Sequence, residues 1–120
     1  MGNAVNQVKQ ALEIEGALAA ALVDGDSGMM LASAGDNSFD LEIAAAGHTE
    51  LLRAEHKTMR ALGVTDTVSD ILVSLGQQYH LLRPLRSAPS IFFYLALDRS
   101  RANLAMARHL LSVLEASTTL

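Results

Sequence analysis

The chain has 120 residues, of which 50% are hydrophobic and 18% are charged, and its formal net charge is -4. This balance is typical of a folded globular chain, and the length predicts a single domain over residues 1–120. Because cysteine is absent, disulfide frameworks and thiolate metal sites are excluded, and a reducing cytoplasmic location is favoured. The negative charge argues against nucleic-acid binding. No apolar run reaches the roughly 20 residues that cross a bilayer, so we expect no membrane insertion.

The first third of the chain predicts a short helix and a hairpin. Apolar residues recur at helical spacing over residues 3–13, which indicates an amphipathic helix. Two apolar runs, 17–23 and 29–34, flank a turn of Gly, Asp and Ser at residues 24–28, and this arrangement predicts a β-hairpin. Neither face of the first run is polar, so we expect a central strand covered by helices on both faces.

The rest of the chain predicts a long helix, three strands and a last helix. Ser38 is the expected N-cap of the long helix, and Gly63 is its stop. Asp98 or Ser100 is the expected cap of the last helix. The expected ranges are 39–62 for the long helix and 67–75, 78–86 and 91–97 for the three strands.

This order of elements predicts an α/β fold, a three-layer α-β-α sandwich. Three consecutive strands joined by short turns form an antiparallel meander, and the first hairpin must join their sheet if both of its apolar faces are to be covered. We therefore expect a five-stranded antiparallel sheet with the long helix on one face and the two terminal helices on the other.

The search for catalytic and ligand-binding motifs gives little. No GxxxxGK[ST] phosphate loop occurs, so we expect no nucleotide bound in that manner and no cofactor. Residues 24–28 begin like a calcium loop but lack the later Gly and Glu that such a loop requires, and the histidines lack zinc-binding spacing. His80 with Asp70 or Ser74 could form a hydrolase site, although no nucleophile elbow accompanies them. The sequence predicts a non-enzyme with no metal site.

The long helix carries two apolar stripes, each recurring at helical spacing. The expected sheet-facing core stripe is Leu41, Ala44, Ala45, His48, Leu51, Leu52, Met59 and Leu62. Nearly opposite lies an outer stripe of small and apolar residues with two charges among them: Ile43, Gly47, Glu50, Ala54, Lys57 and Ala61. Small residues let another helix backbone approach closely, so the outer stripe predicts a helix–helix contact. The same residues would also suit a solvated face, because alanine is a strong helix former.

Between the two stripes lies a basic strip, which predicts a partner-binding surface. Its members are Thr49, Arg53, His56 and Arg60. The alternative is that these charges belong to an ordinary solvated face.

Five segments together resemble a known family. They are the short helix that ends in Glu15-Gly16, the hairpin AALVDGDSGMMLAS, the Ala-rich long helix, the strand pair LVSLGQQYHLLRPL and the closing segment IFFYLALDRSRANLAMARHLL. They resemble the roadblock domain family of dynein light chains and of bacterial regulators of small Ras-like GTPases. The resemblance covers nearly all of the chain and includes no catalytic residue, so the chain is expected to be a single roadblock-like domain.

The resemblance implies a homodimer in which the third strand pairs with its twin and the long helices pack together. Here the dimer would form along Ser69, Ile71 and Val73 and along the outer stripe of the long helix. The resemblance also implies binding to a small Ras-like GTPase or to a larger scaffold protein. Two functions follow: a regulator of a GTPase's nucleotide cycle, or a passive dimeric adaptor in a larger signalling or motor complex.

Overall fold

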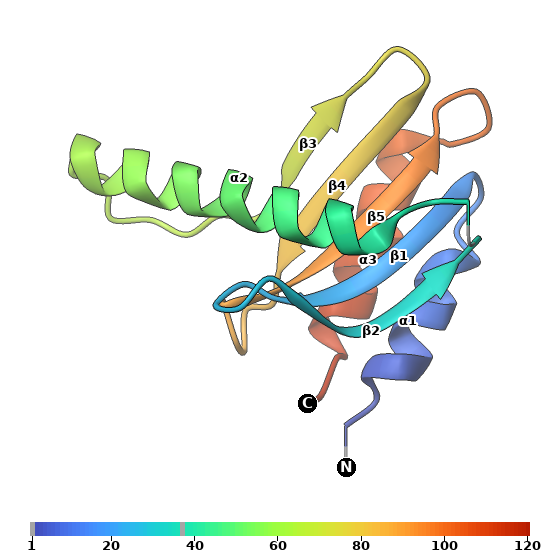
Figure 1. The fold of residues 1–120 in the computed structure, drawn as a ribbon, viewed down its shortest axis with the longest axis horizontal. Coiled ribbons are helices and arrows are strands. Elements are labelled where there is room, and N and C mark those ends of the chain that lie inside the picture. Colours follow the sequence, from blue (N-terminus) through green and yellow to red (C-terminus); the bar gives the residue numbers. More distant parts are fainter. Residues whose placement is uncertain (1, 37) are drawn as a thin grey trace.

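The computed structural model describes residues 2–36 and 38–120, and in these residues three helices and five strands follow one another in the predicted order (Figure 1). The helices are α1 (Ala4–Leu12), α2 (Leu41–Leu62) and α3 (Leu104–Ala116). The strands are β1 (Ala17–Asp24), β2 (Met29–Gly35), β3 (Ile71–Ser74), β4 (Gln78–Pro84) and β5 (Ile91–Asp98).

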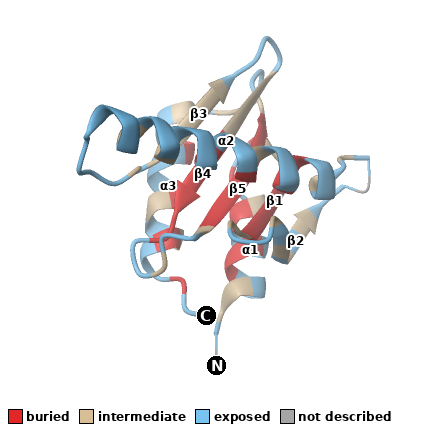
Figure 2. Cartoon of the chain, turned by 60° about the vertical axis from the view of Figure 1, so that its left-hand side comes forward, coloured by how far each residue is buried: buried red, intermediate tan, exposed pale blue. Residues whose placement is uncertain are grey.

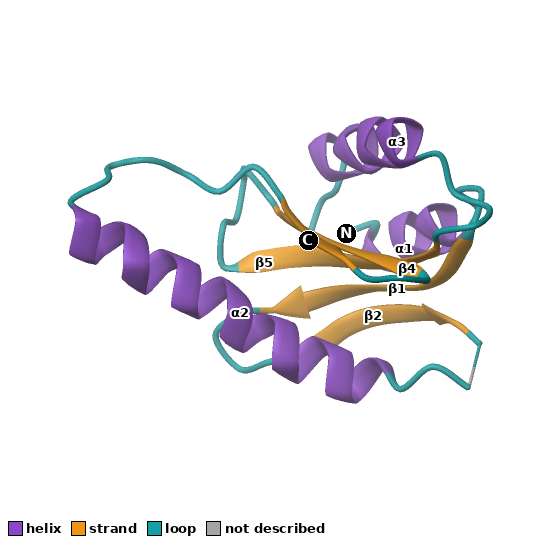
Figure 3. Ribbon diagram, turned by 90° about the horizontal axis from the view of Figure 1, so that it is seen from above, coloured by secondary structure: helices purple, strands orange, loops and turns teal. Residues whose placement is uncertain are grey.

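The five strands form one antiparallel sheet in the order β2-β1-β5-β4-β3. The pairing of β1 with β5, in which Ala21 lies opposite Tyr94, joins the first hairpin to the later meander. This pairing leaves β2 and β3 as the two edges. Figure 3 shows α2 on one face of the sheet and α1 with α3 on the other, so the predicted three-layer sandwich is confirmed.

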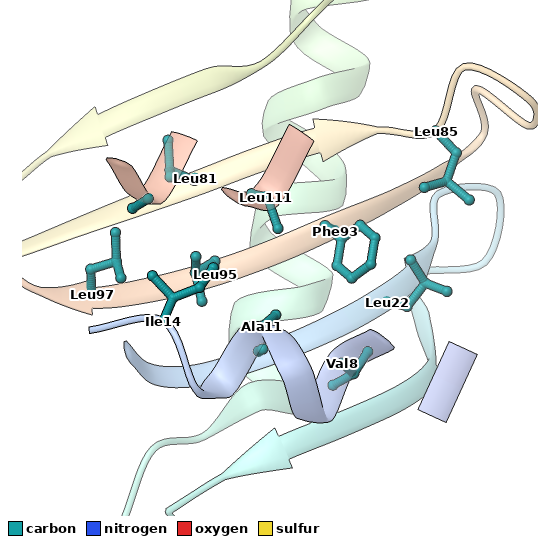
Figure 4. Packing of buried hydrophobic residues seen from close by; sticks show 12 residues of the cluster. Val8, Ala11, Ile14, Leu22, Leu81, Leu85, Phe93, Leu95, Leu97 and Leu111 are labelled. Carbon is teal, nitrogen blue, oxygen red and sulfur yellow. The ribbon is translucent and has the colours of Figure 1, made fainter. Parts of the chain in front are cut away.

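The two faces of the sheet bury separate cores, because successive side chains of a strand point to opposite sides. Beneath α1 and α3, Val8, Phe93 and Leu111 belong to a cluster of fully enclosed side chains (Figure 4). Beneath α2, a second cluster includes Leu52 and Tyr94. Since β1 and β5 supply both cores, neither of these strands has a polar face, as the sequence predicted.

Only the first half of α2 packs on the sheet. Its buried residues are Ala44, Ala45, Thr49 and Leu52, and from residue 53 onward the helix runs out beyond the strands (Figures 1 and 2). The predicted core stripe is therefore wrong at Leu51 and Leu62, whose side chains are 38% and 71% exposed. The helical periodicity continues to the end of α2, but no sheet lies beneath the last turns to cover it.

Two predicted helix caps are wrong. The carboxylate of Asp40, not the hydroxyl of Ser38, accepts the backbone N–H of Ile43 at 3.1 Å, so α2 begins at Leu41. Asn103 caps α3 by accepting the N–H of Met106 at 3.0 Å, whereas Asp98 accepts hydrogen bonds from the N–H and the hydroxyl of Ser100 in the turn before the helix. The predicted stop at Gly63 is confirmed, since this residue takes the left-handed conformation with φ of 70°.

The edge strand β3 is shorter than predicted. It spans Ile71–Ser74 instead of residues 67–75, and Ile71 pairs with Leu82. Continuing this register would place Ser69 opposite Pro84, which has no N–H to donate, so the ladder ends there. Ser69 therefore lies outside the strand in which the sequence placed it.

We predict that Phe93→Ala lowers the free energy of unfolding by about 3–5 kcal/mol, because the ring is fully buried between the sheet and both terminal helices. Urea denaturation followed by circular dichroism measures the change. Val113→Ala is the control, since Val113 on α3 is 52% exposed and should change stability by less than about 0.5 kcal/mol. Similar losses in the two variants would contradict the described packing.

Candidate functional site

The outer stripe is exposed along the whole length of α2. Ile43, Ala54 and Ala61 all face solvent, and Ile43 is 71% exposed. A Cβ atom built on Gly47 would meet no atom within 4 Å. Within the chain, this face of α2 is therefore open to the backbone of a second helix.

The second half of α2 adds exposed apolar residues at its far end. Leu62 is 71% exposed, and Val64, which follows the helix, is 46% exposed. Large apolar side chains at such exposure are informative when they gather on one projecting element, because they mark surfaces that contact other molecules. The projecting half of α2 is thus the first part of the candidate site.

The outer edge of β3 is the second part. β3 pairs with β4 on one side only, and its four residues carry no charge. Val73 lies opposite His80, whose ring packs against His48 of α2, so Val73 and Ile71 lie on the face of the sheet that α2 covers. Both side chains are half-buried. An uncharged edge of this kind is a ready template for pairing with another strand.

Thr49 does not belong to the basic strip. Its side chain is 2% exposed, and its hydroxyl donates to the carbonyl of Ala45 at 2.7 Å. At this position α2 still lies over the sheet, and the Thr49 hydroxyl faces the hairpin turn near Gly28. The prediction that Thr49 contacts a partner is wrong for this reason.

Arg53 ties α2 to the β1–β2 turn. One Nη atom lies 2.6 Å from a carboxylate oxygen of Glu50, and the other donates to the carbonyls of Gly25 and Asp26 at 3.2 and 2.8 Å. Half of the side chain is still exposed. Arg53 therefore orients the projecting helix while it keeps one face toward solvent.

The remaining members of the basic strip differ in surroundings. His56 is half-buried at the underside of α2, where it lines two cavities together with Pro89 of the β4–β5 turn. Arg60 is exposed, and no acidic group among the described residues forms an ion pair with it. Arg60 is thus available for an acidic partner.

The hydrolase hypothesis is wrong, because the sheet separates its members. His80 lies on the face of α2, with Nε2 2.8 Å from the amide oxygen of Gln78. Asp70 turns to the opposite face, where Arg108 of α3 donates two hydrogen bonds to it at 2.8 and 2.9 Å. Ser74 accepts a hydrogen bond from Arg99. In the described residues, no group of three or more His, Cys, Asp or Glu side chains could hold a metal ion.

An aromatic cluster under α2 escaped sequence reasoning. The rings of His48 and His80 have centroids 5.4 Å apart, and both pack on Tyr94, with Phe39 at the margin. Burial raises the pKa of Tyr94. Burial, together with the neighbouring His48, lowers the pKa of His80. Residues from three elements meet here, so only the strand pairing could have shown their proximity.

No family model and no curated protein matches the sequence. Solved structures do match the fold. A Roadblock/LC7 domain from Streptomyces avermitilis superposes with a TM-score of 0.81 at 15% identity, covering 94% of this chain and 92% of that one. The chain has the Roadblock/LC7 fold. The roadblock resemblance of the sequence is thereby confirmed for the fold.

Two MglB structures share this roadblock fold with the chain. Myxococcus xanthus MglB superposes with a TM-score of 0.74 at 16% identity, over 93% of this chain and 85% of that one. An MglB with a tetrameric arrangement superposes with a TM-score of 0.80 at 17% identity, covering 96% of this chain and 84% of that one.

No helix in the described part of the chain is long and apolar enough to cross a bilayer.

We predict that His80 makes the folded chain less stable in mild acid. The pKa of His80 is lowered in the folded state, so the unfolded chain takes up a proton first as the pH falls. The free energy of unfolding should therefore decrease as the pH falls below about 6.5, the ordinary pKa of histidine, toward the folded pKa.

Urea denaturation at about pH 7.5 and about pH 5 measures this loss, on either side of the ordinary histidine pKa. His80→Gln should lose less stability than the parent between the two conditions. His109→Gln, on the exposed side of α3, is the control and should behave as the parent does. Equal losses in all three chains would refute the role of His80.

Proposed function

We propose that this protein is a non-enzymatic, dimeric regulatory module, a single roadblock-like domain over residues 1–120, that binds a small Ras-like GTPase in the cytoplasm and modulates its nucleotide cycle or signalling. The observation that carries the proposal is the projecting half of α2 beside the uncharged, unpaired edge of β3. A lone helix that runs beyond its sheet leaves apolar side chains uncovered, and a second copy of the same surface would cover them.

The outer stripe suits an antiparallel pair of α2 helices about a two-fold axis at Ala54. In that arrangement Gly47 lies opposite Ala61 of the partner helix, and Glu50 lies near the partner's Lys57 with opposite charge. Glu50 already pairs with Arg53 within its own chain, so it would be shared between two cations. The β3 edges would pair through Ile71 and Val73, whereas Ser69 would lie in the loop that borders this contact.

The partner follows from the roadblock resemblance, since bacterial members of that family regulate small Ras-like GTPases. Arg53, His56 and Arg60 would meet an acidic GTPase surface, with Thr49 excluded by its burial. No arginine among them is an obvious arginine finger, so modulation would act through GTPase conformation. The second candidate function is a passive dimeric adaptor. The tetrameric arrangement of one MglB structure supports this alternative, because it shows the fold in a larger assembly.

We predict that Ala54→Arg converts the dimer to monomers with an intact fold. Two arginines would meet in a closely packed contact, at a cost of several kcal/mol, about the scale for overpacking plus unpaired buried charge. Light scattering measures the mass, and circular dichroism measures the helix content.

The matched control for this change is Ala105→Arg on α3, an exposed alanine outside the proposed contact, which should leave the mass unchanged. An undiminished Ala54→Arg dimer would show that the outer stripe is a solvated face.

We predict that the dimer binds a Ras-like GTPase encoded beside its gene and changes the rate of GTP hydrolysis or nucleotide exchange. A fluorescent nucleotide on the GTPase reports both rates. Arg60→Glu should weaken binding about tenfold, because a rim charge would be reversed against an acidic surface. Arg101→Glu, whose native side chain pairs with Asp98 away from α2, is the control. Unchanged nucleotide rates with intact dimers would favour the passive adaptor.

A further inference from the structure

We propose that the outer edge of β2 binds an extended, basic segment of a partner protein as an additional strand of the sheet. β2 is the edge opposite β3, and it pairs only with β1 on its inner side. Figure 1 shows β2 at the margin of the sheet. Three strands separate the two edges, so the inference does not depend on the proposed function, which uses the β3 edge and the projecting half of α2.

The backbone of β2 supplies the hydrogen-bonding groups for an added strand. In an antiparallel ladder, alternate residues of an edge strand direct their N–H and C=O groups away from the neighbouring strand. Among the described residues, residues 30–35 bond to no backbone group outside the strand ladder. β2 contains neither a charged residue nor a proline, so nothing in its sequence opposes further pairing. Peptides that add a strand to such an edge gain affinity from main-chain hydrogen bonds.

A β-bulge restricts the available part of this edge. Two successive residues of β1 lie opposite Met30 and Ala32, so Leu31 between them is the extra residue. A bulge bends the strand and hinders pairing with a further strand there. Over residues 32–35 the register with β1 is regular. The added strand therefore lies along residues 32–35.

A groove beside this part of β2 defines the charge of the partner. The groove has a volume of about 730 Å³ and lies between residues 33–35 and the start of α2. Three carboxylates line it, those of Asp36, Asp40 and Glu42, and its described lining includes no Lys, Arg or His. None of the three forms an ion pair within the described part of the chain.

Two of these carboxylates also have a structural role. Asp36 accepts the backbone N–H of Ser38 at 2.9 Å, and Asp40 accepts that of Ile43 at 3.1 Å. A carboxylate has about four acceptor positions, so each can bind a second donor. The positive end of the α2 dipole offsets roughly half of one charge. Because Glu42 is exposed, more than two negative charges remain for a cationic partner.

The charge of the whole chain is divided in the same sense. Between Lys9 and Arg53 the sequence contains eight Asp and Glu residues and no Lys or Arg. This segment includes β1, β2 and the first half of α2. Its electric field would attract a basic segment and repel an acidic one. The partner segment is therefore rich in Lys or Arg.

The opposite face of the added strand would lie beside α1, which packs against β1 and β2. Gln7 of α1 faces α3, because its Nε2 donates to the carbonyl of Leu114 at 2.9 Å. Val5 lies roughly 160° around the helix from Gln7, on the side of β2, and is 58% exposed. Successive side chains of a strand point to opposite faces. The partner segment should thus alternate basic residues, which face the groove, with apolar residues, which face Val5.

A synthetic peptide of about six residues that alternates Lys and Val tests the site, since strands commonly have this length. Nuclear magnetic resonance of the isotope-labelled full chain follows the backbone amides of residues 32–35. We expect saturable shifts confined to β2 and the groove. The outward amide protons of β2 should exchange more slowly when the peptide is bound, because they become hydrogen-bonded. A peptide that alternates Glu and Val should not bind.

A triple variant tests the carboxylates. Asp36→Asn, Asp40→Asn and Glu42→Gln together remove three charges, and the two asparagines keep an acceptor oxygen for the backbone N–H groups. Affinity for the Lys–Val peptide should fall about fivefold or more, the scale for losing three exposed ion pairs. Asp66→Asn, at an exposed carboxylate in the loop before β3, is the matched control and should bind as the parent does.

The Lys–Val peptide methylated at every backbone nitrogen keeps its charge but cannot donate to a strand, so it should not bind. Equal binding of the two peptides would overturn the proposal, because charge alone would explain it. Absent or unsaturable shifts would also overturn it. The same holds if the β2 amides shift with protein concentration alone, since the occupant would then be a second copy of the chain. If the triple variant fails to fold, the methylated peptide still decides the question.

Discussion

The pairing of β1 with β5 is the contact on which the rest of the structure depends. It joins two strands that lie at opposite ends of the chain, and both are buried on their two faces. Without it the hairpin would have no cover for its alanine-rich strand, and neither core could close. The order β2-β1-β5-β4-β3 follows, and with it the position of β3 as an unpaired edge.

The length of α2 is the second constraint. The sheet covers this helix only as far as Leu52, so the following turns must find contacts elsewhere or remain in water. Arg53 marks the boundary between the covered and the projecting half of α2, because its guanidinium donates a hydrogen bond to the β1–β2 turn while half of the side chain faces solvent. The helix is thus held at its first half by apolar packing and at its middle by charge-assisted hydrogen bonds. This leaves the outer stripe and the far end exposed.

Polar groups at the sheet end are organised differently from those under α2. Glu115 links α3 to the end of β4, because its carboxylate accepts hydrogen bonds from Arg83 and from the backbone N–H of Arg86. Under α2, in contrast, the rings of His48 and His80 pack on Tyr94, and burial lowers the pKa of His80. The two faces of one sheet are therefore held by different contacts: an ion pair between β4 and α3 on one face, and packed rings under α2 on the other.

The sequence by itself determined the order of the elements, the antiparallel sheet and its layers, because apolar periodicity and turn residues are local signals. It also indicated the outer stripe, since helical spacing alone places Gly47 and Ala54 on one face. Only the tertiary structure decided how far the sheet extends beneath α2. For this reason Thr49 is buried and Leu62 is exposed. Likewise, Pro84 shortened β3 through a register that no local pattern contains. Contacts between distant segments, such as Arg83 with Glu115, depend on strand pairing, so residue spacing could not show them.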